Sequence, residues 1–159
     1  MSAGITGMIY SNTHTQDQIF EASMNALFAQ GCRAVKTTEA DGTVCMYNAV
    51  QEDGTCHHCA VGLLMSDEEL EKYGDLVMGA SGLVARIAQD QKRFAPTTVV
   101  TRLFGILQGI HDSAYVHTLE QQRSFSRVLM SRIEDERLHL LDVGVSSAAI
   151  TRVRLAAGL

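Results

Sequence analysis

The chain has 159 residues, of which 46% are hydrophobic and 19% charged, so it fits one folded domain over residues 1–159 and is not an intrinsically disordered chain. The net charge of −5 argues against a broad nucleic-acid-binding surface, and no apolar run approaches the roughly 20 residues that span a bilayer. Because the first residues also lack the basic and apolar regions of a signal peptide, we expect a cytoplasmic protein with no membrane partner.

The first predicted element is an amphipathic helix over about residues 16–30. Thr15 and Gln18 have the spacing of a capping box, in which each side chain bonds the backbone N–H of the other. Apolar residues then recur at helical spacing, and Gly31 is a typical helix end.

A short β-hairpin is predicted next. Residues 36–42 are polar and predict a turn, whereas residues 43–50 alternate in polarity as a strand does. Asp53 and Gly54 form a turn signal. The chain therefore doubles back there, into the segment that begins at Cys56.

Helices are predicted for the middle of the chain. Ser66 and Glu69 form a second capping box, so a helix begins near residue 67. Gly79 and Gly82 are expected to interrupt it, and a further helical segment ends before Pro96. The next helix, capped at residue 97 or 98, carries an apolar stripe formed by Val100, Leu103, Phe104, Leu107 and His111.

The C-terminal part predicts two more helices. Thr118 and Gln121 form a third capping box, which opens the longest helix, and Gly144 closes it. Ser146 or Ser147 caps a last helix that reaches about residue 157. We therefore predict an α+β fold, a mainly helical single domain with a small antiparallel β-hairpin packed on helices.

A thiol active site is one functional hypothesis. The run after Cys59 could form a helical turn whose free N–H groups lower the pKa of the thiol. His111 would act as the base and Asp112 or Gln108 would orient it, which predicts a cysteine-dependent hydrolase or transferase. The alternative for His111 is a core histidine, because it continues an apolar stripe.

A structural zinc site is a second hypothesis. Cys56 and Cys59 form a C-x-x-C pair that encloses His57 and His58, and Cys45 across the hairpin and His111 on a distant helix could complete the set. The four ligands that we predict are Cys45, Cys56, His58 and Cys59. No second C-x-x-C or H-x-x-H pair is present. The alternative is that these cysteines are small buried hydrophobic residues and that the protein has no cofactor.

The C-terminus offers a third hypothesis, a helix-turn-helix that binds DNA. Gly144 would make the turn, Ser147 would cap the second helix, and Arg152 and Arg154 would contact phosphates or bases. Leu140 departs from this pattern, which usually has a small residue four positions before the glycine. The alternative is an ordinary helix hairpin with two solvated arginines.

An acidic cluster at the start of a helix is a candidate for partner binding. Asp67, Glu68, Glu69 and Glu71 could contact a basic protein. The alternative is a solvated first helical turn whose acids stabilise the helix dipole.

Several short motifs occur in a fixed order along the chain. They are Ile19-Phe20, Gln30-Gly31, Cys45-Met46-Tyr47, Cys59 followed by A-V-G-L-L-M-S and Asp67, Leu107-Gln108 with His111-Asp112, and Gly158-Leu159. In this order the chain resembles a group of small bacteriophage and prophage proteins with C-x-Y, C-A-x-G-x-L-[IM]-x-D and L-Q-x-x-H-D motifs. The segment between Tyr47 and Cys59 is longer than in that pattern.

The resemblance implies a phage accessory protein in the cytoplasm of a host cell. Small phage proteins of this kind act by binding a host macromolecule, such as a defence or nucleic-acid-handling protein, and this is the leading functional hypothesis. The enzyme and the DNA binder are the alternatives, and a homo-oligomer is compatible with the sequence. The resemblance also implies that Cys45, Cys59, His111 and Asp112 meet in one place.

Overall fold

The structure of the protein is a computed structural model that describes residues 13–38, 42–45, 47–76, 78–91, 96–114 and 124–159. In residues 35–38 and 42–45 it describes the backbone alone. The elements are, in chain order, α1 (Gln16–Gln30), β1 (Val35–Thr38), β2 (Gly42–Cys45), β3 (Asn48–Val50), β4 (Cys56–His58), the 3₁₀ turn η2 (Gly62–Leu64), α2 (Asp67–Tyr73), α3 (Ala80–Asp90), α4 (Thr98–Ser113), α6 (Phe125–Asp135), α7 (Arg137–Asp142) and α8 (Ser147–Ala156). Helices dominate and the strands form two antiparallel pairs, so the predicted α+β class is confirmed.

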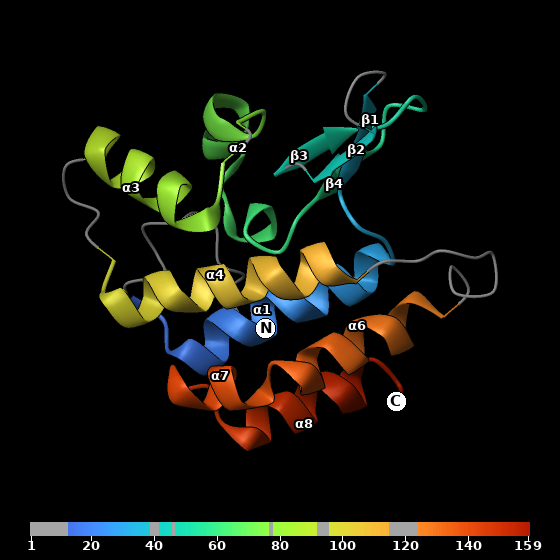
Figure 1. Ribbon diagram of the computed structural model, residues 1–159, viewed down its shortest axis with the longest axis vertical. Helices are drawn as coiled ribbons and strands as arrows, with labels where there is room; N and C mark the ends of the chain where they lie inside the picture. The colour runs from blue at the N-terminus through green and yellow to red at the C-terminus, as the bar shows by residue number, and fades with distance from the viewer. Residues whose placement is uncertain (1–12, 39–41, 46, 77, 92–95, 115–123) are drawn as a thin grey trace.

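Helices α1 and α4 form the middle of the molecule. Figure 1 shows them side by side, with α6, α7 and α8 along one side and α2, α3 and the strands along the other. Their completely buried side chains include Phe20, Met24 and Leu27 of α1 and Phe104 and Leu107 of α4. Burying a side chain of this size stabilises the fold by roughly 1.5–3 kcal/mol. The described buried apolar residues form one cluster, in keeping with the predicted single domain.

Both ends of α1 lie where the sequence predicted them. The Thr15 hydroxyl accepts from the Gln18 N–H, and the Gln18 side chain accepts from the Thr15 N–H. Gly31 has a φ of 74°, in the left-handed region that glycine adopts without steric cost.

The strands agree with the prediction in part. β3 and β4 form the predicted hairpin, with Asn48 opposite His58. Residues 36–42 were expected to be a turn, and this prediction was wrong for residues 36–38, which belong to β1 and pair with β2, and for Gly42, which belongs to β2; residues 39–41 lie outside the described residues. β1 has the sequence VKTT, and its three β-branched residues favour a strand although two of them are polar. The strand predicted over residues 43–50 is divided between β2 and β3, which belong to different sheets.

The helices α2 and α4, in the middle of the chain, begin at the capping residues that the sequence predicted. Ser66 and Glu69 form the predicted capping box of α2, and the Thr97 side chain caps α4. Gly79 precedes α3, whereas Gly82 lies inside it and does not interrupt it. A glycine inside a helix costs only about 1 kcal/mol, which burial of the apolar face of α3 offsets.

The long C-terminal helix is divided into α6 and α7. Its predicted capping box at residues 118–121 lies outside the described residues. The prediction of one continuous helix was wrong at Glu136, whose backbone leaves the helical conformation with φ −91° and ψ 5°. After this break, Leu140 of α7 and Val143, which directly follows α7, are both buried in the core. None of the described helices is long and apolar enough to cross a bilayer.

Candidate functional site

Cys59 follows β4 and caps the turn that comes next. Its side chain is completely buried. The Gly62 N–H donates to Cys59 Sγ at 3.3 Å, and the Leu63 N–H donates to the Cys59 carbonyl at 2.9 Å. A Cβ on Gly62 would lie 2.1 Å from the Tyr47 carbonyl oxygen, so glycine allows this close approach. The geometry of this one turn therefore explains why the C-A-x-G motif has a cysteine at Cys59 and a glycine at Gly62.

Burial controls the acidity of this thiol. It raises the pKa of Cys59 to about 12, against the lowering effect of the Gly62 and Val61 N–H groups. The N–H groups expected from the sequence are therefore present, but desolvation outweighs them. At neutral pH the thiol is protonated, which makes it a poor nucleophile.

His111 is buried in α4, and both of its ring nitrogens have partners. Nε2 accepts from the Ala34 N–H at 2.9 Å, and Nδ1 lies 2.8 Å from Asp112 Oδ1. Because Nε2 accepts, the ring proton is on Nδ1 and is donated to the carboxylate. This arrangement is that of a core histidine which links α4 to the segment after α1.

Gln108 connects the thiol to this pair. Its Nε2 donates to Asp112 Oδ1 at 2.8 Å, and its side chain also hydrogen-bonds Cys59. Cys59 and His111 thus lie at two ends of one polar network that runs through Gln108 and Asp112. Both nitrogens of His111 are occupied by other groups, so the network provides no base for the thiol. The geometry favours a structural role over the hydrolase or transferase hypothesis. For Cys45, in β2, only the backbone is described.

A second thiol–imidazole contact was missed by the sequence analysis. Cys32 Sγ lies 3.4 Å from His57 Nδ1. Cys32 follows the C-terminus of α1, where the helix dipole disfavours a thiolate, and burial raises the pKa of its thiol. Nothing in the local sequence links these two residues, because they are 25 positions apart.

The C-x-x-C pair does not form a metal clip on its own. Cys56 is exposed, whereas Cys59 is buried in the core. Among the side chains that the structure describes, no three His, Cys, Asp or Glu residues gather closely enough to hold a metal ion. The backbone of His58 is instead held by Gln30, whose amide accepts from the His58 N–H at 2.8 Å and donates to its carbonyl at 2.9 Å.

The acidic cluster on α2 contains three exposed residues, Asp67, Glu68 and Glu71. Glu69 is buried and has to be removed from the predicted contact surface. Its carboxylate accepts from the Ser66 N–H at 2.9 Å and from Gln91 at 3.3 Å. Glu69 therefore anchors the helix start, and the capping-box spacing was the signal for this role.

The C-terminal arginines are paired within the chain. Arg152 forms ion pairs with Glu21 and Asp17 of α1, and Arg154 forms one with Glu134 of α6. Ser147 is the first residue of α8, and the helix is capped by the preceding serine. These pairs occupy the cations that the DNA-binding hypothesis requires, so the geometry favours a helix hairpin.

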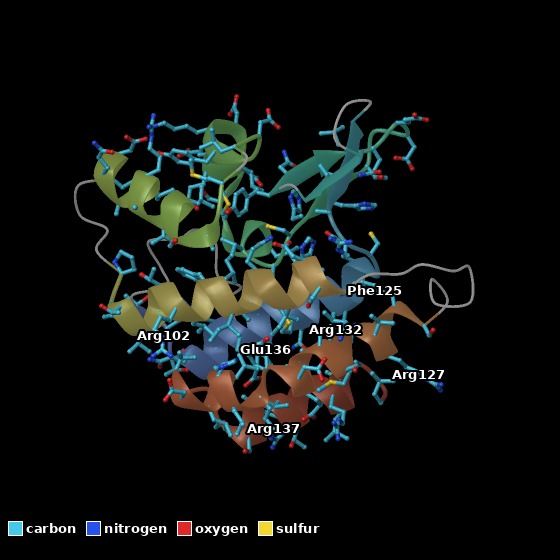
Figure 2. The ribbon with its side chains drawn as sticks, viewed as in Figure 1. Arg102, Phe125, Arg127, Arg132, Glu136 and Arg137 are labelled. Carbon is cyan, nitrogen blue, oxygen red and sulfur yellow. The ribbon has the colours of Figure 1, made fainter. Side chains whose placement is uncertain are left out.

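A groove of about 310 Å³ lies between α4 and the junction of α6 with α7. Figure 2 labels Arg102 on α4 and Glu136 at this junction. The residues that line the groove are Arg102, Gly105, Ile106, Gly109, Glu136 and His139. Arg102 forms an ion pair with Asp142 at 2.7 Å, and Glu136 Oε2 lies 2.7 Å from His139 Nδ1.

Comparison of the chain with protein-family models, with curated proteins and with solved structures finds no match. The function must therefore be argued from the residues of this chain alone.

Proposed function

We propose that this chain is a phage-type accessory protein that acts in the host cytoplasm by binding a host macromolecule through Asp67, Glu68 and Glu71. The observation that carries this proposal is the exposure of all three carboxylates without a salt bridge in the described part of the chain. Single-sign charge on an exposed surface raises the rate of encounter with a partner of opposite charge.

The ion pairing of the other helices supports this choice. The described acidic residues on α1, α3, α4, α6 and α7, and the one at the junction of α6 with α7, are each paired with an Arg, Lys or His residue. They are Asp17, Glu21, Asp90, Asp112, Glu134, Asp135, Glu136 and Asp142. Each of these carboxylates has a nitrogen partner within the fold, whereas no such pair is formed by the three α2 acids among the described residues.

The α2 surface is also well placed for contact. Figure 1 shows α2 at the end of the molecule opposite α7 and α8. The buried Glu69 fixes the first turn through the capping box, so its exposed neighbours are held on a defined helix start. A basic surface, such as that of a nucleic-acid-handling or defence protein, has the complementary charge.

The test is affinity capture from a bacterial host lysate with three forms of the chain. The first is the wild type, and the second is Asp67→Asn/Glu68→Gln/Glu71→Gln, which raises the net charge by three. The third is Asn25→Lys/Ala29→Lys/Ser131→Lys, which raises the net charge equally at exposed positions of α1 and α6.

We expect the wild type and the lysine variant to retain the same basic protein and the neutralised variant to lose it. Retention should weaken as salt is added, because exposed charges are screened over about 10 Å at 0.1 M salt. Equal retention by all three forms, or no reproducible protein with the wild type, contradicts the proposal.

A further inference from the structure

The groove between α4 and the junction of α6 with α7 has an unfilled floor. Gly105 and Gly109 line it from one face of α4, and a Cβ on either glycine would meet no atom within 4 Å. Ile106, a half-buried residue of the same helix, adds an apolar side chain to the lining. Because glycine lets another group come close to the helix backbone, this floor can accept an apolar side chain.

The helix α7, on the other side of the groove, exposes two leucines. Leu138 is 79% exposed, more than any other large apolar side chain that the structure describes, and Leu141 is 39% exposed. They are three positions apart and therefore share one face of the helix. His139, which follows Leu138, lines the groove, and Asp142, which follows Leu141, pairs with the lining residue Arg102. The exposed leucines therefore lie beside the groove on the same surface.

The charges around this groove are of both signs. Arg102 pairs with Asp142, and Arg137 of α7 pairs with Glu134 of α6. A strongly acidic or strongly basic partner would meet like charges here, whereas a second copy of the same surface brings both signs. The acids of α2 lie at the opposite end of the molecule, so they do not repel one another when two such surfaces meet (Figure 1).

An exposed leucine and an apolar groove side by side have the arrangement that a two-fold symmetric interface requires, because both copies then present the same surface. We propose that two copies of this chain form a dimer in which Leu138 of each copy enters the groove of the other. The contact removes apolar surface from water in both copies at once, and this drives the association. The inference goes beyond the proposed function and does not rest on it, because the α2 acids stay exposed in this dimer.

The dimer should be weak and should depend on the protein concentration. A stable interface buries roughly 800 Å² on each partner. A groove of about 310 Å³ and two leucines form only the centre of such an interface. We therefore expect a dissociation constant on the order of 10 µM, which places this dimer among the transient complexes.

The test is sedimentation velocity of the whole chain over a concentration series from about 5 to 500 µM, which brackets the expected dissociation constant. Leu138→Lys should weaken the dimer at least about tenfold, because symmetry removes the leucine from both contacts and a lysine enters an apolar groove. The matched control is Val50→Lys on β3, which adds the same charge at a position that is 64% exposed and distant from the groove. It should associate as the wild type does.

A second variant fills the groove and keeps the leucine. Gly109→Gln places a side chain in the open space above the floor, so it should fold normally and also weaken the dimer about tenfold. In an equimolar mixture with Leu138→Lys, the intact leucine of one variant can enter the intact groove of the other. One of the two contacts is then restored, and the mixture should associate more tightly than either variant alone.

Three outcomes would overturn the dimer. A wild type that stays monomeric up to about 500 µM would show that the surface does not bind its own copy. Equal association of Leu138→Lys and Val50→Lys would place the interface elsewhere. A mixture that associates no more tightly than its components would contradict the contact between the leucine and the groove. Far-ultraviolet circular dichroism of each variant checks that a loss of association does not come from unfolding.

Discussion

His111 Nε2 accepts a hydrogen bond from the Ala34 N–H, which lies 77 residues earlier in the chain. The bond joins α4 to the segment that leads from α1 into β1. On its other side the ring donates to Asp112, which also accepts from Gln108. Removing one member of a buried polar network leaves the groups that it bonded without partners, so each member becomes a sensitive position.

The first prediction concerns His111. His111→Ala leaves the buried Ala34 N–H without an acceptor and opens a cavity, so we expect the free energy of unfolding to fall by about 3 kcal/mol or more. Urea denaturation measures this change. The control is His139→Ala, an exposed histidine paired with Glu136, for which we expect a loss below about 1 kcal/mol. Similar losses in the two variants would show that the His111 network does not stabilise the core.

The second prediction concerns the pH dependence of stability. Burial raises the pKa of Cys59 from 9.0 to about 12. Between these values the unfolded thiol loses its proton and the folded thiol keeps it, so stability falls as the pH rises through this window. Below pH 9 the contribution of the thiol is fully present. By about pH 10.5 we expect it to have decreased by about 2 kcal/mol.

This effect is isolated by comparison with Cys59→Ala. Burial also raises the pKa of Tyr47, which weakens stability in the same direction at alkaline pH in both proteins. The urea midpoint of the wild type should therefore decrease more steeply between about pH 8 and pH 10.5 than that of the variant. Parallel curves would show that Cys59 ionises as readily in the folded protein as in the unfolded chain.

Local signals predicted the fold better than distant ones. The capping boxes at Thr15 and Ser66 were correct because a cap depends on residues within four positions. The hairpin at Gly54 was correct for the same reason. Residues 36–38 were mispredicted because polarity suggested a turn, whereas strand formation depended on pairing with β2.

The candidate sites were also predicted less well where they depend on contacts between residues that are distant in sequence. The sequence brought Cys59 and His111 together but could not assign the partners of each nitrogen, since Ala34 is distant in sequence and offers only a backbone N–H. The contact between Cys32 and His57 and the groove beside Glu136 join segments with no common local pattern. Glu69 was counted as a surface acid, although its capping-box position already indicated an inward role.

The third prediction separates Glu69 from its neighbour Glu68. Glu69→Ala removes the acceptor for the Ser66 N–H and for Gln91, so we expect a loss of about 1–2 kcal/mol. Glu68 is exposed, and Glu68→Ala should change stability by less than about 0.5 kcal/mol. Glu69→Gln should recover part of the loss, because glutamine can also close a capping box. Thermal unfolding of the three variants checks this order, and equal effects at both positions would contradict the anchoring role of Glu69.

The fourth prediction concerns two glycines, one in a crowded position and one with open space around it. A Cβ on Gly62 would lie 2.1 Å from the Tyr47 carbonyl oxygen, so Gly62→Ala must displace backbone and should destabilise the protein by about 2 kcal/mol or more. A Cβ on Gly105 would meet no atom within 4 Å. Because alanine favours a helix over glycine by about 1 kcal/mol, Gly105→Ala should stabilise α4. Urea denaturation of both variants checks the opposite signs, and a neutral Gly62→Ala would mean that η2 does not pack against Tyr47 as described.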